Sequence, residues 1–159
     1  MPGMKLGTLS MKTLLAPECI AMDVAPASVE QCLDEAARLF HESHGLRRSD
    51  VAQRLWRRER RQSTALGYGI ALPHADVHSL TRPVAAFMRV RHPLAFQAPD
   101  RQTVRDVFVL LVPRPATAGH FELLSHYRRL LTQEGFRQRL AACGDEAAVW
   151  RLFEQHEWR

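Results

Sequence analysis

The chain has 159 residues, of which 46% are hydrophobic and 25% are charged, and its formal net charge at pH 7 is +5. This composition excludes a disordered chain, and the length suits one domain with a buried core. No apolar stretch approaches the roughly 20 residues that span a bilayer, and the N-terminus lacks a signal-peptide pattern. We therefore expect one cytoplasmic domain over residues 1–159, of which residues 1–8 can be disordered.

The first part of the chain predicts a strand and two helices. Residues 19–24 are a strand candidate. Ser28 begins a Ser-x-x-Gln capping box ahead of an amphipathic helix, and Gly45 provides the stop signal for that helix. A second helix is expected from Ser49, as its cap, to the arginine cluster at 57–61, because basic side chains are favourable at the negative end of a helix dipole.

The middle of the chain predicts several strands separated by loops. Residues 70–72 are a short apolar run that ends at Pro73, and residues 84–90 alternate as expected for a strand with one apolar face. Residues 107–112 are continuously apolar, which predicts a buried central strand. Long loops are expected over residues 92–106 and 113–119.

The C-terminal part predicts three helices, over residues 120–131, 136–140 and a last one capped by Asp145. A strand, two helices, several strands and three helices indicate an α/β layered domain with a mixed sheet. This order is not a regular βαβαβ repeat, so a doubly wound sheet is not expected.

The segment 58–76 carries the parts that a phosphate site needs. Arginines at a helix end supply charge, a glycine turn exposes backbone N–H groups, and a neutral imidazole has a lone pair that can form a labile P–N bond. The spacing matches neither GxGxxG nor a P-loop, so on its own it is a modest signal. The residues are Arg58, Ser63, Thr64, Gly67, Gly69 and His74.

Metal, disulfide and cofactor sites are not expected. The three cysteines are odd in number and form no Cys-x-x-Cys pair, so we expect buried, reduced thiols. His74 and His78 have the spacing of a helical metal pair, but neither a cysteine nor a third ligand is near them in the sequence. Asp76 and His78 are instead expected on a surface loop.

Seven arginines lie between positions 47 and 61. Such a cluster can attract nucleic acid, acidic proteins or phosphate, and it is also compatible with a solvated helix face. Trp56 is the one aromatic residue among them, so nucleic-acid binding is not the favoured interpretation.

The segment 58–76 resembles the active-site stretch of enzyme IIA domains of the bacterial phosphoenolpyruvate-dependent sugar phosphotransferase system, fructose/mannitol class. The resemblance is closest to the nitrogen-regulatory IIA proteins and covers roughly residues 8–155. It is carried by Arg58-Glu59, Ser63-Thr64, Gly67, Gly69-Ile70-Ala71-Leu72-Pro73-His74, Pro93-Leu94-Ala95-Phe96, Leu110-Leu111-Val112-Pro113, His120 and Leu123-Leu124. The fold then expected is a three-layer α/β/α sandwich with a central mixed β-sheet flanked by helices.

The resemblance also implies residue roles. His74 is the expected phosphoacceptor, His120 is expected beside it in a hydrogen bond with the ring or the phosphate, and Arg58 is expected to bind or orient the phosphoryl group. The expected pocket residues are Ser63, Thr64, Gly67 and Gly69. The expected donor is a histidine phosphocarrier protein, and the regulated partners are not named by the sequence.

Three functions remain open at this stage. The favoured one is a regulatory protein whose phosphorylation state controls partners, because the sequence shows neither a permease segment nor a fused carrier domain. The others are a transport IIA subunit that hands the phosphoryl group to a sugar permease component, and a binding module of the same fold that is not phosphorylated.

The chain departs from the family pattern at Gln62, Ala65, Tyr68, Ala75 and Asp76. The carboxylate of Asp76 would repel a phosphoryl dianion by roughly 2–4 kcal/mol before screening.

Overall fold

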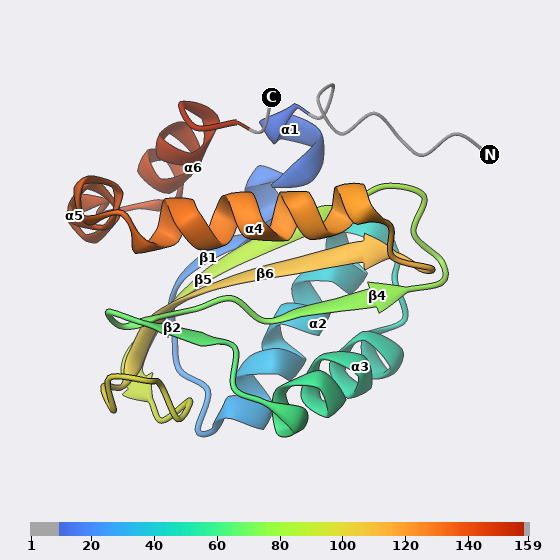
Figure 1. Cartoon of the computed structure of the whole chain (residues 1–159), viewed down its shortest axis with the longest axis horizontal. Coiled ribbons are helices and arrows are strands. Elements are labelled where there is room, and N and C mark those ends of the chain that lie inside the picture. The colour runs from blue at the N-terminus through green and yellow to red at the C-terminus, as the bar shows by residue number, and fades with distance from the viewer. Residues whose placement is uncertain (1–9, 158–159) are drawn as a thin grey trace.

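A computed structural model describes residues 10–157, so the expectation for residues 1–8 lies outside the described residues. One mixed sheet lies between two layers of helices, which confirms the expected three-layer α/β/α sandwich (Figure 1). The strands follow the order β1-β5-β6-β3-β2, and β4 pairs with β6 further along the same edge. They are β1 Ile20–Val24, β2 Ala65–Gly67, β3 Ile70–Ala71, β4 His74–Val77, β5 Val84–Leu94 and β6 Val104–Pro113.

The helices α2 and α3 cover one face of the sheet, and α4 crosses the other face in front of β6 (Figure 1). None of the helices in residues 10–157 is long and apolar enough to cross a membrane. The helical elements are α1 Met11–Leu14, the short 3-10 turn η2 Pro17–Cys19, α2 Val29–His44, α3 Arg48–Arg61, α4 Ala118–Thr132, α5 Glu134–Ala142 and α6 Glu146–Glu154.

The predicted ends of α2 are confirmed. The Ser28 side chain accepts a hydrogen bond from the Gln31 backbone N–H, and Gly45 ends the helix in a left-handed conformation. The Gln31 side chain accepts from the backbone N–H of Ala27, so the reciprocal half of the capping box reaches one residue further back than expected.

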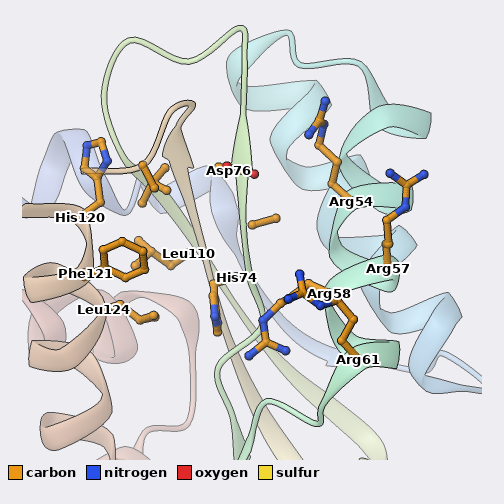
Figure 2. A pocket seen from close by; sticks show the side chains of 13 residues that line it. Arg54, Arg57, Arg58, Arg61, His74, Asp76, Leu110, His120, Phe121 and Leu124 are labelled. Atoms are coloured by element: carbon orange, nitrogen blue, oxygen red, sulfur yellow. The ribbon is translucent and has the colours of Figure 1, made fainter. Parts of the chain in front are cut away.

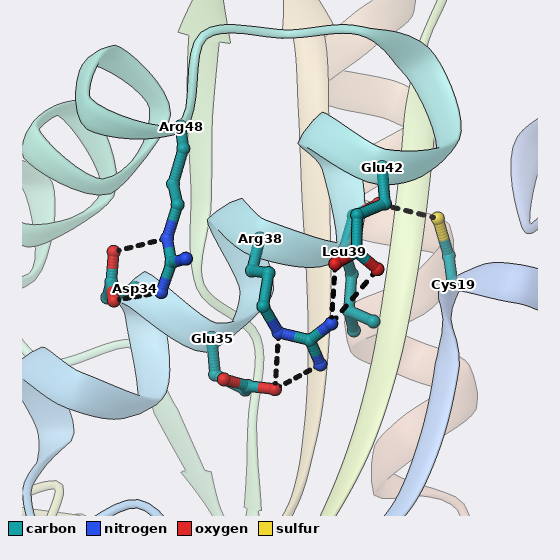
Figure 3. A network of polar contacts seen from close by, with 7 residues as sticks. All are labelled: Cys19, Asp34, Glu35, Arg38, Leu39, Glu42 and Arg48. Atoms are coloured by element: carbon teal, nitrogen blue, oxygen red, sulfur yellow. Dashed lines mark hydrogen bonds and ion pairs between the residues drawn. The ribbon is translucent and has the colours of Figure 1, made fainter.

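The expected cap of α3 is wrong. Its N-cap is Arg47, which makes no side-chain capping bond, and Ser49 lies inside the first turn. In that turn the guanidinium of Arg48 binds the carboxylate of Asp34 on α2, with 2.6 Å between Nη2 and Oδ2 (Figure 3). This contact between two helices is tertiary, and local capping signals do not reveal it.

The predicted central strand is confirmed as β6, but β5 differs from the expectation. It extends to Leu94, and β6 already begins at Val104, so the loop is shorter than the expected 92–106. Residues 84–90 are all buried, although one exposed face was expected. The reason is that β5 lies between β1 and β6 with helices over both faces, so even Arg89 is inside the protein.

Arg89 forms a buried ion pair with Asp106, its direct neighbour on β6, with 2.7 Å between Nε and Oδ1. The same guanidinium donates to the backbone carbonyls of Leu140 and Cys143, each at 2.7 Å, and so satisfies the C-terminal end of α5. Every polar atom of the pair is thereby occupied by a partner, which is the condition under which a buried charge is tolerated.

We expect Arg89→Ala to lower the free energy of unfolding by about 3–5 kcal/mol, because it leaves a buried carboxylate and two carbonyls without their donor. Arg91→Ala is the matched control, two residues along the same strand, where the ion pair with Asp23 is exposed. Its expected cost is far smaller, because solvent screens an exposed ion pair. Urea unfolding of both variants tests this, and equal costs would contradict the structural role of the buried pair.

Candidate active site

A cleft of about 440 Å³ opens between α3 and α4, with β4 as its floor (Figure 2). β4 pairs with β6 along one edge, and no strand of the described sheet covers its other edge. Side chains of α3 and α4 border the cleft there. The lining residues are Arg54, Arg57, Arg58 and Arg61 from α3, His74, Ala75 and Asp76 from β4, Leu110 and Val112 from β6, Ala116, and His120, Phe121 and Leu124 from α4.

His74 follows the apolar run that was expected to end at Pro73, and it is the first residue of a further strand, β4. β3 and β4 pair with β6 at one constant offset of 36 residues, shown by Ile70 opposite Asp106 and His74 opposite Leu110. Pro73 between them has no N–H, and its carbonyl accepts a hydrogen bond from Leu110 at 3.0 Å. The chain therefore continues beside β6 across this interruption, and the pairing fixes the position of His74.

The ring of His74 has one tautomer in this structure. Its Nδ1 lies 2.9 Å from the carbonyl oxygen of Leu72, which can only accept, so Nδ1 carries the proton and Nε2 keeps the lone pair. Burial lowers the pKa of His74, the bond to Leu72 opposes this, and the positive charges of Arg58 and Arg128 lower the pKa further. The ring is therefore neutral near pH 7.

His120 lines the same cleft from the α4 wall and has the opposite tautomer (Figure 2). Its Nδ1 accepts the backbone N–H of Thr117 at 3.0 Å, while the Thr117 side chain accepts the N–H of His120. This is a capping box in which histidine replaces the usual Glu or Gln. Because a backbone N–H can only donate, the proton of the neutral His120 ring is on Nε2, and burial lowers its pKa.

Arg58 faces two hollows that share His74. It lines the main cleft and also a smaller one next to Ser63, Thr64 and the β2 residues, to which Arg128 of α4 contributes. Its Nη1 donates to the carbonyl of Gln62 at 2.7 Å, which holds the guanidinium near the end of its own helix. The structure thus brings Arg58, Ser63 and Thr64 together around His74.

The hydroxyls of Ser63 and Thr64 are already occupied. Ser63 Oγ donates to the carbonyl of Phe96. The buried carboxylate of Glu59 accepts from both the backbone N–H and the hydroxyl of Thr64, at 2.8 and 2.5 Å. The backbone carbonyl of Thr64 in turn accepts a hydrogen bond from the N–H of Leu72 at 3.0 Å. Thr64 thus connects the end of α3 to the residue before Pro73 and β4, whereas Ser63 connects it to the loop after β5.

Gly67 and Gly69, which were expected in the pocket, line neither of the two hollows around His74. They flank Tyr68 in the turn between β2 and β3, and all three residues have positive φ angles. The carboxylate of Asp100 accepts the N–H of Tyr68 at 2.8 Å and approaches Gly67 so closely that a Cβ there would lie 3.3 Å from it. The glycines therefore permit a turn, and no phosphate contact is assigned to them.

Asp76 lies in β4 and not in a surface loop, so that expectation is wrong. It lines the cleft, and its Oδ2 is 4.0 Å from Nε of Arg114. His78 is exposed in the turn after β4. Within residues 10–157, no group of three or more His, Cys, Asp or Glu side chains is arranged to hold a metal ion. Cys19 and Cys32 are buried as expected, whereas Cys143 is partly exposed.

Sequence reasoning missed three side chains of the site. Glu59 was noted only as part of a motif, although a carboxylate in a helix that ends in arginines is a signal for an internal partner. Phe121 and Arg128 belong to a predicted helix, but the direction in which they point depends on how α4 packs on the sheet. No local pattern supplies that direction.

Comparisons with known proteins show similarity over most of the chain. A model of the family described as phosphoenolpyruvate-dependent sugar phosphotransferase system, EIIA 2, matches residues 13–156. The chain is 35% identical over 139 residues to a nitrogen regulatory protein of Bradyrhizobium diazoefficiens, covering 87% of this chain and 91% of that protein. It is similar to the crystal structure of nitrogen regulatory protein IIA-Ntr from Neisseria meningitidis, with a TM-score of 0.80, 34% identity, and coverage of 87% of this chain and 95% of that one.

The fold is also similar to that in a solution structure of Escherichia coli enzyme IIAMTL in complex with phosphorylated enzyme IIBMTL. The TM-score is 0.73 and the identity 20%, with 89% of this chain and 99% of that chain covered. At this identity the likeness concerns the fold alone.

The two histidines of the cleft should be distinguishable by ¹⁵N NMR of the imidazole rings at pH 7.5. We expect His74 as the Nδ1–H tautomer and His120 as the Nε2–H tautomer, and we expect both to titrate below the ordinary pKa of about 6.5. Assignment uses His74→Gln and His120→Gln. The same tautomer in both rings, or a His74 midpoint above that of a free imidazole, would contradict the geometry.

We expect Glu59→Ala to lower the free energy of unfolding by about 2–4 kcal/mol, because the buried N–H and hydroxyl of Thr64 lose a charged acceptor. Glu42→Ala is the matched control, since Glu42 is exposed on α2 and, within residues 10–157, has Arg38 as its ion-pair partner. Its expected cost is about 0.5 kcal/mol or less. Chemical unfolding and amide exchange at Leu72 measure the effect. Similar costs for both variants would contradict the stabilising role of the bonds between Glu59 and Thr64.

Proposed function

The chain belongs to the EIIA 2 family of the phosphoenolpyruvate-dependent sugar phosphotransferase system, and we propose that it accepts a phosphoryl group on Nε2 of His74 from a histidine phosphocarrier protein. The observation that carries this proposal is the hydrogen bond from Nδ1 of His74 to Leu72. It leaves a neutral ring whose lone pair is on Nε2, which is the state that a nitrogen nucleophile requires.

The transfer exchanges one P–N bond for another. The Nε2 lone pair of His74 attacks phosphorus, the bond between phosphorus and the donor imidazole breaks, and the donor ring leaves with the electron pair of that bond. Once Nε2 carries phosphorus, the His74 ring becomes more positive. The carbonyl of Leu72 stabilises this ring through Nδ1–H, so the hydrogen bond strengthens as the reaction proceeds.

Positioning and charge neutralisation do most of the remaining work in phosphoryl transfer. Arg58 lines both hollows around His74 and supplies a guanidinium for the phosphoryl oxygens. His120 supplies a neutral Nε2–H donor on the α4 wall. Ser63 and Thr64 act indirectly, because their hydroxyls are already bonded to Phe96 and Glu59.

A regulatory role is favoured over sugar transport. The relatives above 30% identity that match nearly the whole chain are nitrogen regulatory proteins. On this proposal, the phosphorylation state of His74 controls the binding of partner proteins. In a transport IIA subunit the same phosphoryl group would instead pass to a IIB component. Adding a IIB protein to the phosphorylated chain and following loss of the phosphoryl group distinguishes the two.

The test is phosphorylation by phosphoenolpyruvate, enzyme I and the histidine phosphocarrier protein of the same genome, followed by intact-mass measurement. We expect a gain of one phosphoryl group in the wild type and none in His74→Gln. Arg58→Gln should slow the transfer on the order of 100-fold, because it removes a charge that stabilises the transferring group. A wild-type chain that gains no mass would favour the binding module that is not phosphorylated.

Arg60→Gln is the control for Arg58→Gln. Arg60 is exposed on the same helix and lines neither hollow around His74, so its transfer rate should stay at the wild-type value. If both variants slow the transfer equally, the effect comes from the general charge of α3 and not from a specific contact of Arg58.

A further inference from the structure

The two walls of the cleft differ in chemistry. The α3 wall presents the guanidinium groups of Arg54, Arg57, Arg58 and Arg61 (Figure 2). Arg54 pairs with Asp50, and Arg58 binds a carbonyl of its own helix. Arg57 and Arg61 are exposed one helical turn apart, and neither makes an ion pair within residues 10–157. This wall therefore has cationic groups that are left for a ligand.

The α4 wall is apolar and incompletely covered. Phe121 is 62% exposed, whereas Leu123 and Tyr127 of the same helix are fully buried on its other face. Leu124 and Ala116 extend the apolar surface beside Phe121. Within the described residues the other large exposed hydrophobic side chain is Tyr68, and it already stacks on Arg137. An unused aromatic beside a cleft is a common anchor for a partner.

We propose that this cleft is the docking site for an acidic segment of a partner protein, in which an apolar side chain covers Phe121 and carboxylates pair with Arg57 and Arg61. The argument is charge complementarity. The four guanidinium groups and the Asp76 carboxylate among the lining residues sum to three positive charges while both histidines are neutral, and Asp50 offsets one of these through its pair with Arg54. A partner without carboxylates would leave these charges desolvated and unpaired.

The same charges make docking sensitive to phosphorylation, a consequence that rests on the proposed function. A phosphoryl group on His74 adds about 1.5 to 2 negative charges at the floor of the cleft. It removes at least half of the net positive charge of the lining residues and brings its own negative charge next to the partner's carboxylates. The unmodified chain should therefore bind the acidic segment more tightly than the phosphorylated chain.

An acidic protein segment fits this cleft better than nucleic acid. Nucleic-acid interfaces are dominated by contacts to phosphates, which do not require an apolar wall. Here Leu124, Ala116 and Phe121 form such a wall. The carboxylate of Asp76 lies on the floor, where a phosphate backbone would meet it. The cleft of about 440 Å³ accommodates a few side chains and not a duplex.

The probe is a short fluorescent peptide with a leucine flanked on both sides by glutamates. The control peptide has lysine in place of every glutamate. Fluorescence anisotropy with the full chain should show binding of the acidic peptide only. Its affinity should fall as the Debye length shrinks from about 30 Å at 0.01 M to about 8 Å at 0.15 M salt. Amide shifts of the ¹⁵N-labelled chain should be confined to α3, β4 and the start of α4.

Charge reversal tests the arginine wall. Arg57→Glu combined with Arg61→Glu should weaken the acidic peptide by about tenfold. The matched control combines Arg139→Glu with Arg151→Glu, two exposed arginines on α5 and α6 that make the same change in net charge. Thermal unfolding by circular dichroism verifies that both double variants fold. Phe121→Ala should weaken the peptide to a similar degree, by about tenfold.

His74→Glu should bind the acidic peptide more weakly than His74→Gln, because the two variants differ only in charge. Equal binding of the acidic and lysine peptides, binding of neither, equal effects of the two double charge reversals, or tighter binding of a DNA duplex would each overturn the docking site. The outcomes are separable from those of the proposed function. A chain that cannot be phosphorylated but prefers the acidic peptide refutes only the phosphoryl transfer, and the reverse result refutes only the docking site.

Discussion

The site depends on one constraint, the register that residues 70–77 keep along β6. β3 and β4 pair with β6 at the same offset, although Leu72 and Pro73 interrupt the strand between them. A slip of one residue would turn His74 to the opposite face of the sheet. In the observed register, His74 lies at an edge of the sheet and the carbonyl of Leu72 reaches its Nδ1. The pairing with β6 thus sets the position of His74, and the local bond to Leu72 sets its tautomer.

Two buried carboxylates lie beside the first residues of that segment. Asp106, the partner of Ile70 on β6, is held by Arg89, and its own N–H donates to the carbonyl of Gly69. Glu59 holds Thr64, whose carbonyl receives the N–H of Leu72. The Glu59 carboxylate also accepts the backbone N–H of Thr64, whereas both oxygens of the Asp106 carboxylate are bound by Arg89. The polar groups of the interior therefore stabilise the geometry around His74.

The sequence predicts those parts of the fold that local signals determine. The cap and stop of α2 and the apolar run of β6 act within a few residues, and both are confirmed. β2 and β4 have three and four residues, too few for a periodic pattern, and they are strands because β3 and β6 lie beside them. The extension of β5 and the first turn of α3 depend likewise on tertiary neighbours.

The same distinction holds for the site. The resemblance to a family identified His74, His120 and Arg58, and the structure places all three around one cleft. The resemblance could not distinguish side chains that face the cleft from side chains that hold the surrounding backbone, because both kinds belong to the same motif. Ser63, Thr64 and the two glycines belong to the second kind here. The two kinds differ in whether their polar groups are already bonded within the protein, and this is known only from the three-dimensional contacts.

Asp76 illustrates how the surroundings change the meaning of a residue. Taken alone, a carboxylate two residues after His74 repels a phosphoryl group. In the cleft it is outnumbered by four arginines, and Arg114 lies 4.0 Å away. Asp76 and Arg114 are both more than 40% exposed, so solvent screens them strongly. The carboxylate therefore reduces the attraction for a dianion without reversing its sign. A site for one phosphoryl group does not need four arginines, and the surplus charge lies on the α3 wall, where a partner protein would meet it.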